Sequence, residues 1–191
     1  MGFTATEPEP ETTDHALMSA VAQGDPRVFE ALVLRYQQTA WNVAYRFLAD
    51  RHQAEDAVQD AFLRVYEASG RYRPEVPFSA YLYRIVVRRC IDVSRKRRSF
   101  SRGLFRARVS TSDARSPEQV LSDRERVERV RVAVGGLPDR QRMAVVLSYL
   151  EGLDTKHTAA AMETTPKAVE RLLARARKAL GRALKMHAAN K

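Results

Sequence analysis

Positively charged side chains crowd into residues 84–108 of this sequence. The stretch holds nine arginines and one lysine against a single acid, Asp92, and such groups neutralise the phosphates of a nucleic acid. Aromatic rings beside a basic surface suit stacking on unpaired bases, and four aromatic residues come just before the stretch: Tyr72, Phe78, Tyr81 and Tyr83. The combination predicts a surface for single-stranded nucleic acid. Packing in a core is the alternative for Tyr83 and Phe78.

A second basic stretch, residues 166–185, has the pattern of an amphipathic helix. Seven basic residues and one acid, Glu170, lie outside an apolar stripe formed by Val169, Leu172, Leu173, Ala176 and Leu180. Residues 154–162 predict a shorter helix before it, and Thr164 and Thr165 mark the break. A short helix, a turn and a basic second helix predict a helix-turn-helix that reads the major groove. A solvated helix with incidental charge is the alternative.

Acidic residues form one patch on this otherwise basic chain. The patch comprises Glu55, Asp56, Gln59 and Asp60. Asp56 and Asp60 are four residues apart, so they share a helix face with Gln59. The patch would repel DNA and should face solvent or a protein with a basic surface. From the spacing alone, a patch that simply faces solvent is favoured over a patch that binds a protein.

The sequence offers no convincing set of residues for catalysis or metal binding. The four histidines, His15, His52, His157 and His187, are far apart and lack metal-ligand spacing. The chain has no phosphate-binding glycine loop and no Gly-x-Ser-x-Gly motif. We therefore expect no catalytic residue, no metal and no cofactor. The one cysteine, Cys90, is expected to be a small buried residue.

Composition agrees with a polyanionic partner. The 191 residues include 33 Lys and Arg against 23 Asp and Glu, which gives a net charge of +10 and an isoelectric point near 10.2. The acidic start lacks the basic and apolar segments of a secretory signal, and no apolar run is long enough to span a bilayer. We expect a cytoplasmic protein without membrane insertion.

Apolar residues recur at three- and four-residue steps in two blocks, so the fold class expected is all-α with two small helical domains. The domains are predicted at 14–98 and 117–187, after a disordered acidic tail at 1–13 and on either side of a flexible basic linker at 99–116. In the first, two helices are predicted on either side of a break at 24–26, a third at about 53–68 and a fourth at 78–97, with a loop at 69–77. In the second, they are predicted at 117–134, 139–151, 154–162 and 166–187.

Four segments together resemble the extracytoplasmic-function sigma factors. Residues 54–66, AEDAVQDAFLRVY, and 78–85, FSAYLYRI, with Asp92 and Arg95, are similar to conserved region 2 of that family. Residues 137–142, LPDRQR, and 168–180, AVERLLARARKAL, are similar to region 4. The resemblance implies a region 2 helical bundle and a region 4 helix-turn-helix. It implies a subunit that joins core RNA polymerase, recognises the −35 and −10 promoter elements and melts DNA by capturing bases.

The resemblance also implies three sets of contact residues. Contacts with the clamp helices of the polymerase's largest subunit fall on Asp56, Gln59, Asp60 and Arg64. Contacts of region 2 with DNA fall on Tyr72, Arg73, Phe78, Tyr81, Arg84, Arg88, Arg89, Arg95 and Lys96. Contacts of region 4 with DNA fall on Lys167, Glu170, Arg171, Ala174, Arg175 and Lys178. The partners implied are core polymerase, through its clamp helices and flap region, promoter DNA and an anti-sigma factor.

The sequence departs from the family pattern at several of these sites. Tyr81 stands where the family usually has Trp, and Arg88 where it often has a base-reading Asn. Glu163 stands at the helix-turn-helix turn, where Gly is expected because the position often demands a positive φ. Two other functions stay open: a two-domain helix-turn-helix regulator that does not join polymerase, and a nucleic-acid-processing enzyme.

Overall fold

All regular structure in the described part of the chain is helical, which confirms the predicted all-α class. The computed structural model describes residues 13–73, 77–104 and 121–189. Among the helices in these ranges, none combines the length and the apolar character needed to cross a membrane. The predicted tail and most of the predicted linker lie outside the described residues.

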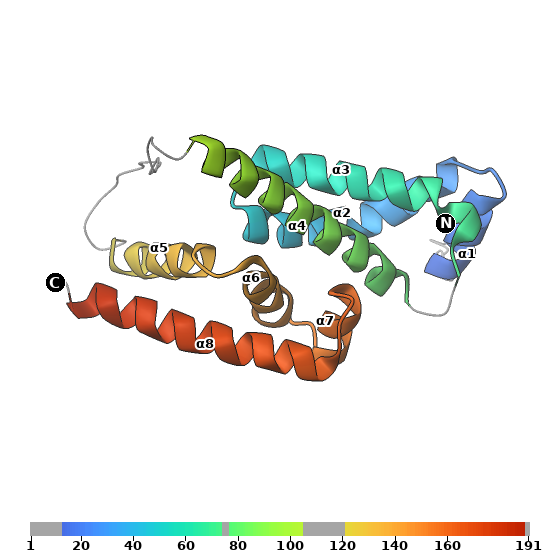
Figure 1. Cartoon of the computed structure of the whole chain (residues 1–191). Coiled ribbons are helices and arrows are strands. Elements are labelled where there is room, and N and C mark those ends of the chain that lie inside the picture. Colours follow the sequence, from blue (N-terminus) through green and yellow to red (C-terminus); the bar gives the residue numbers. More distant parts are fainter. Residues whose placement is uncertain (1–12, 74–76, 105–120, 190–191) are drawn as a thin grey trace, which may run out of the picture.

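The first domain is a bundle of three long helices with a short one at its end (Figure 1). Helices α2 (Arg27–Leu48), α3 (Arg51–Glu67) and α4 (Phe78–Leu104) pack against one another. Helix α1 (Asp14–Ala22) packs on α2 and on the single 3₁₀ turn η1 (Ser69–Arg71). The break predicted at 24–26 is present, and Gly24 adopts φ 97° there, which side chains rarely allow.

Local side-chain bonds set where α3 begins. The Asp50 carboxylate accepts a hydrogen bond from the backbone N–H of Gln53 at 3.0 Å, and the Gln53 side-chain amide donates to the same carboxylate at 3.0 Å. Such a cap satisfies an otherwise unpaired donor of the first turn. The helix therefore starts at Arg51, slightly before the predicted position.

Helix α4 continues beyond its predicted end near residue 97 and reaches Leu104. Arg and Lys are good helix formers, and no Gly or Pro interrupts the chain before Gly103. Residues 99–104 of the predicted linker are thus helical, and residues 105–116 lie outside the described part.

The second domain consists of α5 (Leu121–Gly135), α6 (Asp139–Val145), the π-helical turn η2 (Val146–Leu150), α7 (Thr155–Ala161) and α8 (Pro166–Ala189). The helix predicted at 139–151 is thus α6 continued by η2. Helices α7 and α8 form the predicted helix-turn-helix. Asp154 caps α7 by accepting from the His157 N–H at 2.7 Å, and Thr165 caps α8 by accepting from the Ala168 N–H at 3.2 Å.

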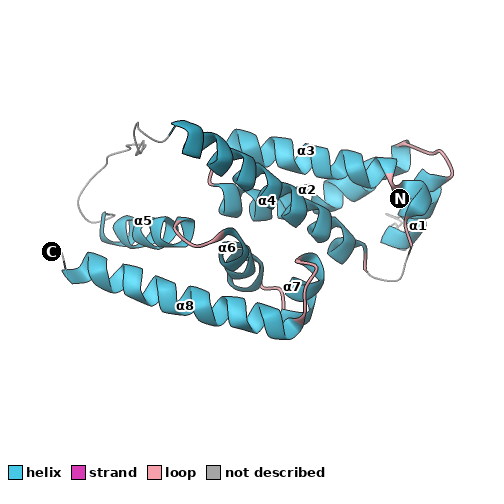
Figure 2. Ribbon diagram, viewed as in Figure 1, coloured by secondary structure: helices cyan, strands magenta, loops and turns pink. Residues whose placement is uncertain are grey.

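The two domains share one hydrophobic core. Fully buried side chains include Phe47, Val65 and Val86 in the first domain and Met143 and Leu147 in the second. They belong to one continuous cluster. Helix α4 packs on α6 and α7, and α2 packs on η2, so the second domain lies against one side of the first (Figure 2).

Cys90 offers a test of this packing. The thiol is fully buried, and burial raises its pKa to about 12. At about pH 8 the reactive thiolate is therefore scarce in the folded chain, whereas an unfolded cysteine ionises near its ordinary pKa. We expect iodoacetamide, followed by mass spectrometry, to modify the native chain much more slowly than the chain in denaturant. Equal rates in the two conditions would contradict the buried position of Cys90.

Candidate nucleic-acid interface

The acidic patch predicted on α3 divides into an exposed part and a paired part. Asp56 and Gln59 are exposed. Asp60 is half-buried, with its carboxylate 2.7 Å from Arg64 Nε and 3.1 Å from Arg89 Nε. The pair to Arg89 ties α3 to α4. Asp56 and Gln59 are thus the members of the patch that are most open to a partner.

A groove beside Gln59 extends this surface onto α2. The groove has a volume of about 430 Å³ and lies between the two helices, with Gln37, Gln38 and Trp41 on one wall and Arg51, Val58 and Gln59 on the other. The Trp41 ring stacks on Tyr45, with centroids 4.8 Å apart. Sequence reasoning missed the α2 wall, because its residues belong to none of the charged patterns.

Aromatic residues gather where the loop before α4 meets α1. Tyr72 is half-buried, its hydroxyl lies 2.7 Å from His15 Nδ1, and its ring centroid is 5.3 Å from that of Tyr81. Phe78 is only 1% exposed and packs on Tyr36. This burial favours the core-packing alternative for Phe78, which supports the two tyrosines from beneath. His15, which the sequence analysis set aside, belongs to the same cluster.

Basic residues of α4 surround a second cleft. Arg84, Arg88, Arg95 and Lys96 are exposed, as is Arg73 before the helix, and Arg89 is half-buried. A cleft of about 380 Å³ is lined by Arg64, Ala68, Tyr81, Ile85, Arg88, Arg89 and Asp92. It combines a ring for stacking, guanidinium donors and one carboxylate acceptor. These groups can bind both a phosphate and the edge of an unpaired base.

Helix α8 presents the predicted reading face to solvent. Val169, Leu173 and Ala176 are buried. The six residues predicted to face DNA are all exposed: Lys167, Glu170, Arg171, Ala174, Arg175 and Lys178. Glu163, at the turn before this helix, adopts φ 48°, the left-handed conformation expected at that position.

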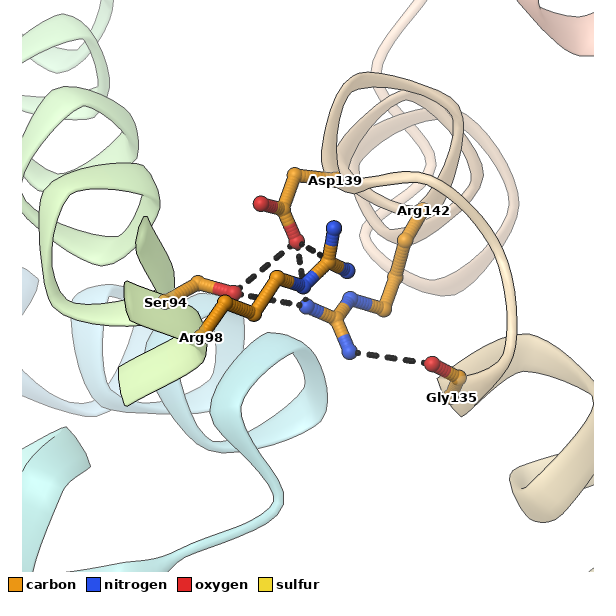
Figure 3. A network of polar contacts seen from close by, with 5 residues as sticks. All are labelled: Ser94, Arg98, Gly135, Asp139 and Arg142. Atoms are coloured by element: carbon orange, nitrogen blue, oxygen red, sulfur yellow. Dashed lines mark hydrogen bonds and ion pairs between the residues drawn. The ribbon is translucent and has the colours of Figure 1, made fainter. Parts of the chain in front are cut away.

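The structure also assembles polar residues that the sequence analysis did not connect. Arg142 of α6 is only 5% exposed, and its guanidinium donates a hydrogen bond to the Ser94 hydroxyl of α4 (Figure 3). These residues come from opposite sides of the predicted linker. Periodicity could not pair them, because it reports which face of a helix is buried and not what covers that face.

Comparisons with known proteins match both domains. The family described as Sigma-70 region 2 matches residues 32–100, and that described as Sigma-70, region 4 matches residues 128–180. The RNA polymerase sigma-H factor of Pseudomonas aeruginosa is 32% identical over 180 residues, which cover 90% of this chain and 93% of that protein. The ECF RNA polymerase sigma-E factor of Escherichia coli K12 is 30% identical over 179 residues, which cover 89% and 93%.

A solved structure has the same overall arrangement. It is the structure of CnrH in complex with the cytosolic domain of CnrY, with a TM-score of 0.67 and 28% identity over 91% of this chain and 97% of CnrH. The family matches and the near full-length relatives cover the two domains in the same order. The chain therefore belongs to the extracytoplasmic-function group of the sigma-70 family, the alternative sigma factors that direct RNA polymerase to promoters.

Proposed function

We propose that this sigma factor binds core polymerase through the exposed acidic face of α3 and the adjoining groove, and binds promoter DNA through α4 and α8. We base this assignment of one partner to α3 and the other to α4 and α8 on the separation of charge between these helices. Asp56 and Gln59 are exposed on α3, whereas the exposed side chains of α4 and α8 named above are mostly basic. A regulator that acts without polymerase has no use for such an acidic face, and the full-length relatives are sigma factors.

For the downstream element we assign base capture to Tyr72 and Tyr81, and phosphate contacts to Arg84, Arg88 and Arg95. Taking a base out of the stack costs a few kcal/mol, so a pocket for it must supply stacking and hydrogen bonds. The support is the aromatic cluster beside the basic cleft. Phe78 contributes by packing under the tyrosines, because its own ring is buried.

For the upstream element we assign base contacts to Lys167, Glu170 and Arg171, and a phosphate contact to Lys178. The exposed glutamate is placed to accept from the amino group of a cytosine. An anti-sigma factor is the regulatory partner that we infer, since the similar protein CnrH was solved with CnrY. The proposal includes no catalytic step and places the protein in the cytoplasm, with the chromosome.

Reversal of charge at Asp56 tests the polymerase contact. We expect sigma-free core polymerase to start at discrete sites on genomic fragments only when this chain is added. Asp56→Arg should reduce this run-off transcription by more than about tenfold, because a like charge at an interface strongly opposes binding.

Glu67→Arg is the matched control for that experiment. It makes the same change of charge on the same helix, roughly 16 Å further along, and should keep most of the activity. No specific initiation by the unchanged chain, with verified active core, would refute the proposed function. Equal losses in the two variants would refute the assigned contact.

Two substitutions in α8 should separate base contacts from phosphate contacts. Arg171→Ala in the holoenzyme should lose about 1–3 kcal/mol of discrimination between the −35 element and a scrambled one. Lys178→Ala should weaken binding to both sequences alike and lower the slope of log affinity against log salt by about 1. Fluorescence anisotropy over a salt series measures both. The opposite pattern would show that the two roles are assigned the wrong way round.

A further inference from the structure

Helix α1 lies against the segment that carries Tyr72, one of the two residues to which base capture is assigned. It packs on α2 and on the 3₁₀ turn η1, which ends directly before Tyr72. The match to Sigma-70 region 2 begins at residue 32, so α1 lies outside the matched residues. A role for this helix must therefore be inferred from its own contacts.

Two kinds of contact hold α1 on the domain without any help from the His15 side chain. Its buried residues are Leu17, Met18 and Val21. At the start of the helix, the Asp14 carboxylate accepts hydrogen bonds from the Arg35 guanidinium and from the Tyr36 hydroxyl of α2. Burial, followed by the hydrogen bond to Asp14, raises the pKa of Tyr36, so its hydroxyl stays protonated and remains a donor. The backbone at residue 15 is thus held in place whatever side chain stands there.

The His15 side chain reaches from this fixed backbone to Tyr72. Its Nδ1 atom lies 2.7 Å from the Tyr72 hydroxyl, which is a hydrogen-bonding distance. The two rings are nearly parallel, with 27° between their planes and 5.8 Å between their centroids. Burial, followed by the charge of Asp14, raises the pKa of Tyr72, so at neutral pH its hydroxyl keeps its proton. Both side chains are half-buried.

The hydrogen bond adds a directional restraint to a ring that is otherwise held by aromatic contacts. The rings of Tyr81 and Phe78 meet the Tyr72 ring edge to face, with centroids 5.3 and 6.2 Å away. Such contacts accept a range of tilts, and the χ2 torsion of a tyrosine is only loosely restricted by itself. A hydrogen bond at the far end of the side chain depends strongly on angle. His15 therefore restricts the orientation of the Tyr72 ring.

A restricted orientation matters for base capture. Taking a base out of the stack is costly, so any further ordering of the protein at that step weakens capture. Ordering one flexible side chain on binding lowers the affinity by about two- to tenfold. A tyrosine that is already held in the receiving orientation avoids this loss.

We propose that His15 is a positioning residue for base capture: its imidazole holds the Tyr72 side chain in the orientation that receives a base of the melted −10 element. Helix α1 thereby belongs to the part of the protein that melts DNA. The inference rests on the proposed function, because that function assigns base capture to Tyr72. It extends that function to a residue and a helix that have no assigned contact with DNA or polymerase.

Binding of the non-template strand of a −10 element to the holoenzyme measures this role. The probe is a fluorescent single-stranded oligonucleotide from a promoter identified by run-off transcription, with versions that lack one base at a time. The captured base is the one whose removal costs the most affinity. His15→Phe keeps a stacked ring but has no polar atom at the place of Nδ1, so it should lower the affinity for the complete strand by about two- to tenfold. The strand without the captured base should bind both proteins alike.

Two variants are matched controls for His15→Phe. Asparagine carries a polar atom as far from the backbone as Nδ1 of histidine, so His15→Asn should keep most of the affinity. Ser19→Ala removes an exposed hydroxyl one turn further along α1 and should change nothing. All three variants should bind core polymerase equally, since α1 is outside the assigned polymerase contact.

A double-mutant cycle with Tyr72→Phe ties the effect to this one hydrogen bond. Tyr72→Phe keeps the ring and removes the hydroxyl, so it should weaken binding of the strand about as much as His15→Phe. The double variant should be no weaker than either single variant, because both changes break the same contact. Additive losses would overturn the proposal, since they would show that the two residues act separately.

Tyr72→Ala separates failure of this inference from failure of the proposed function. An affinity unchanged by Tyr72→Ala would refute base capture by Tyr72, and with it the role of His15. A loss with Tyr72→Ala but none with His15→Phe would overturn the positioning role and leave base capture intact. If circular dichroism shows that His15→Phe does not fold, His15→Ala takes its place in every comparison, since alanine is the best helix former.

Discussion

The burial of one guanidinium group, that of Arg142, is the constraint on which the arrangement of this molecule depends. Arg142 belongs to the second domain, yet its partners Ser94 and Phe47 belong to the first. A charge in such a position is stable only while its hydrogen bonds are made, and the Gly135 carbonyl oxygen accepts another of them at 3.3 Å. The contact therefore selects one orientation of the domains.

That orientation has different consequences for the three functional faces. Asp56 and Gln59 on α3 are exposed, so the surface proposed for polymerase stays open in this arrangement. The reading face of α8 is exposed, and the turn at Glu163 lies beside Arg84 of α4.

Much of the fold could be predicted from the sequence, because it follows from local rules. The three- and four-residue steps of apolar residues place the helices, and Thr165 with Pro166 marks the start of α8. The left-handed backbone at Glu163 was implied by the family resemblance, because the residue stands where that family has a glycine. The exposed faces of α3 and α8 follow from the same periodicity.

Other features depend on contacts that no local pattern encodes. The end of α4 at Leu104 was missed because a run of Arg and Ser resembles a linker in composition although its residues tolerate a helix. The burial of Phe78 and the bond between Tyr72 and His15 depend on α1 and α2. Arg98 pairs with Asp139 from the other side of the predicted linker, whereas in the sequence it belongs to a basic stretch that resembles a DNA-binding surface.

Small-angle X-ray scattering of the unmodified chain, free of polymerase, DNA and other proteins, tests the central claim most directly. A closed molecule should scatter as one compact particle, with a radius of gyration close to the roughly 16 Å expected for a folded chain of this length. A distinctly larger radius, with the profile of two separate bodies, would contradict a free chain that holds its own domains together.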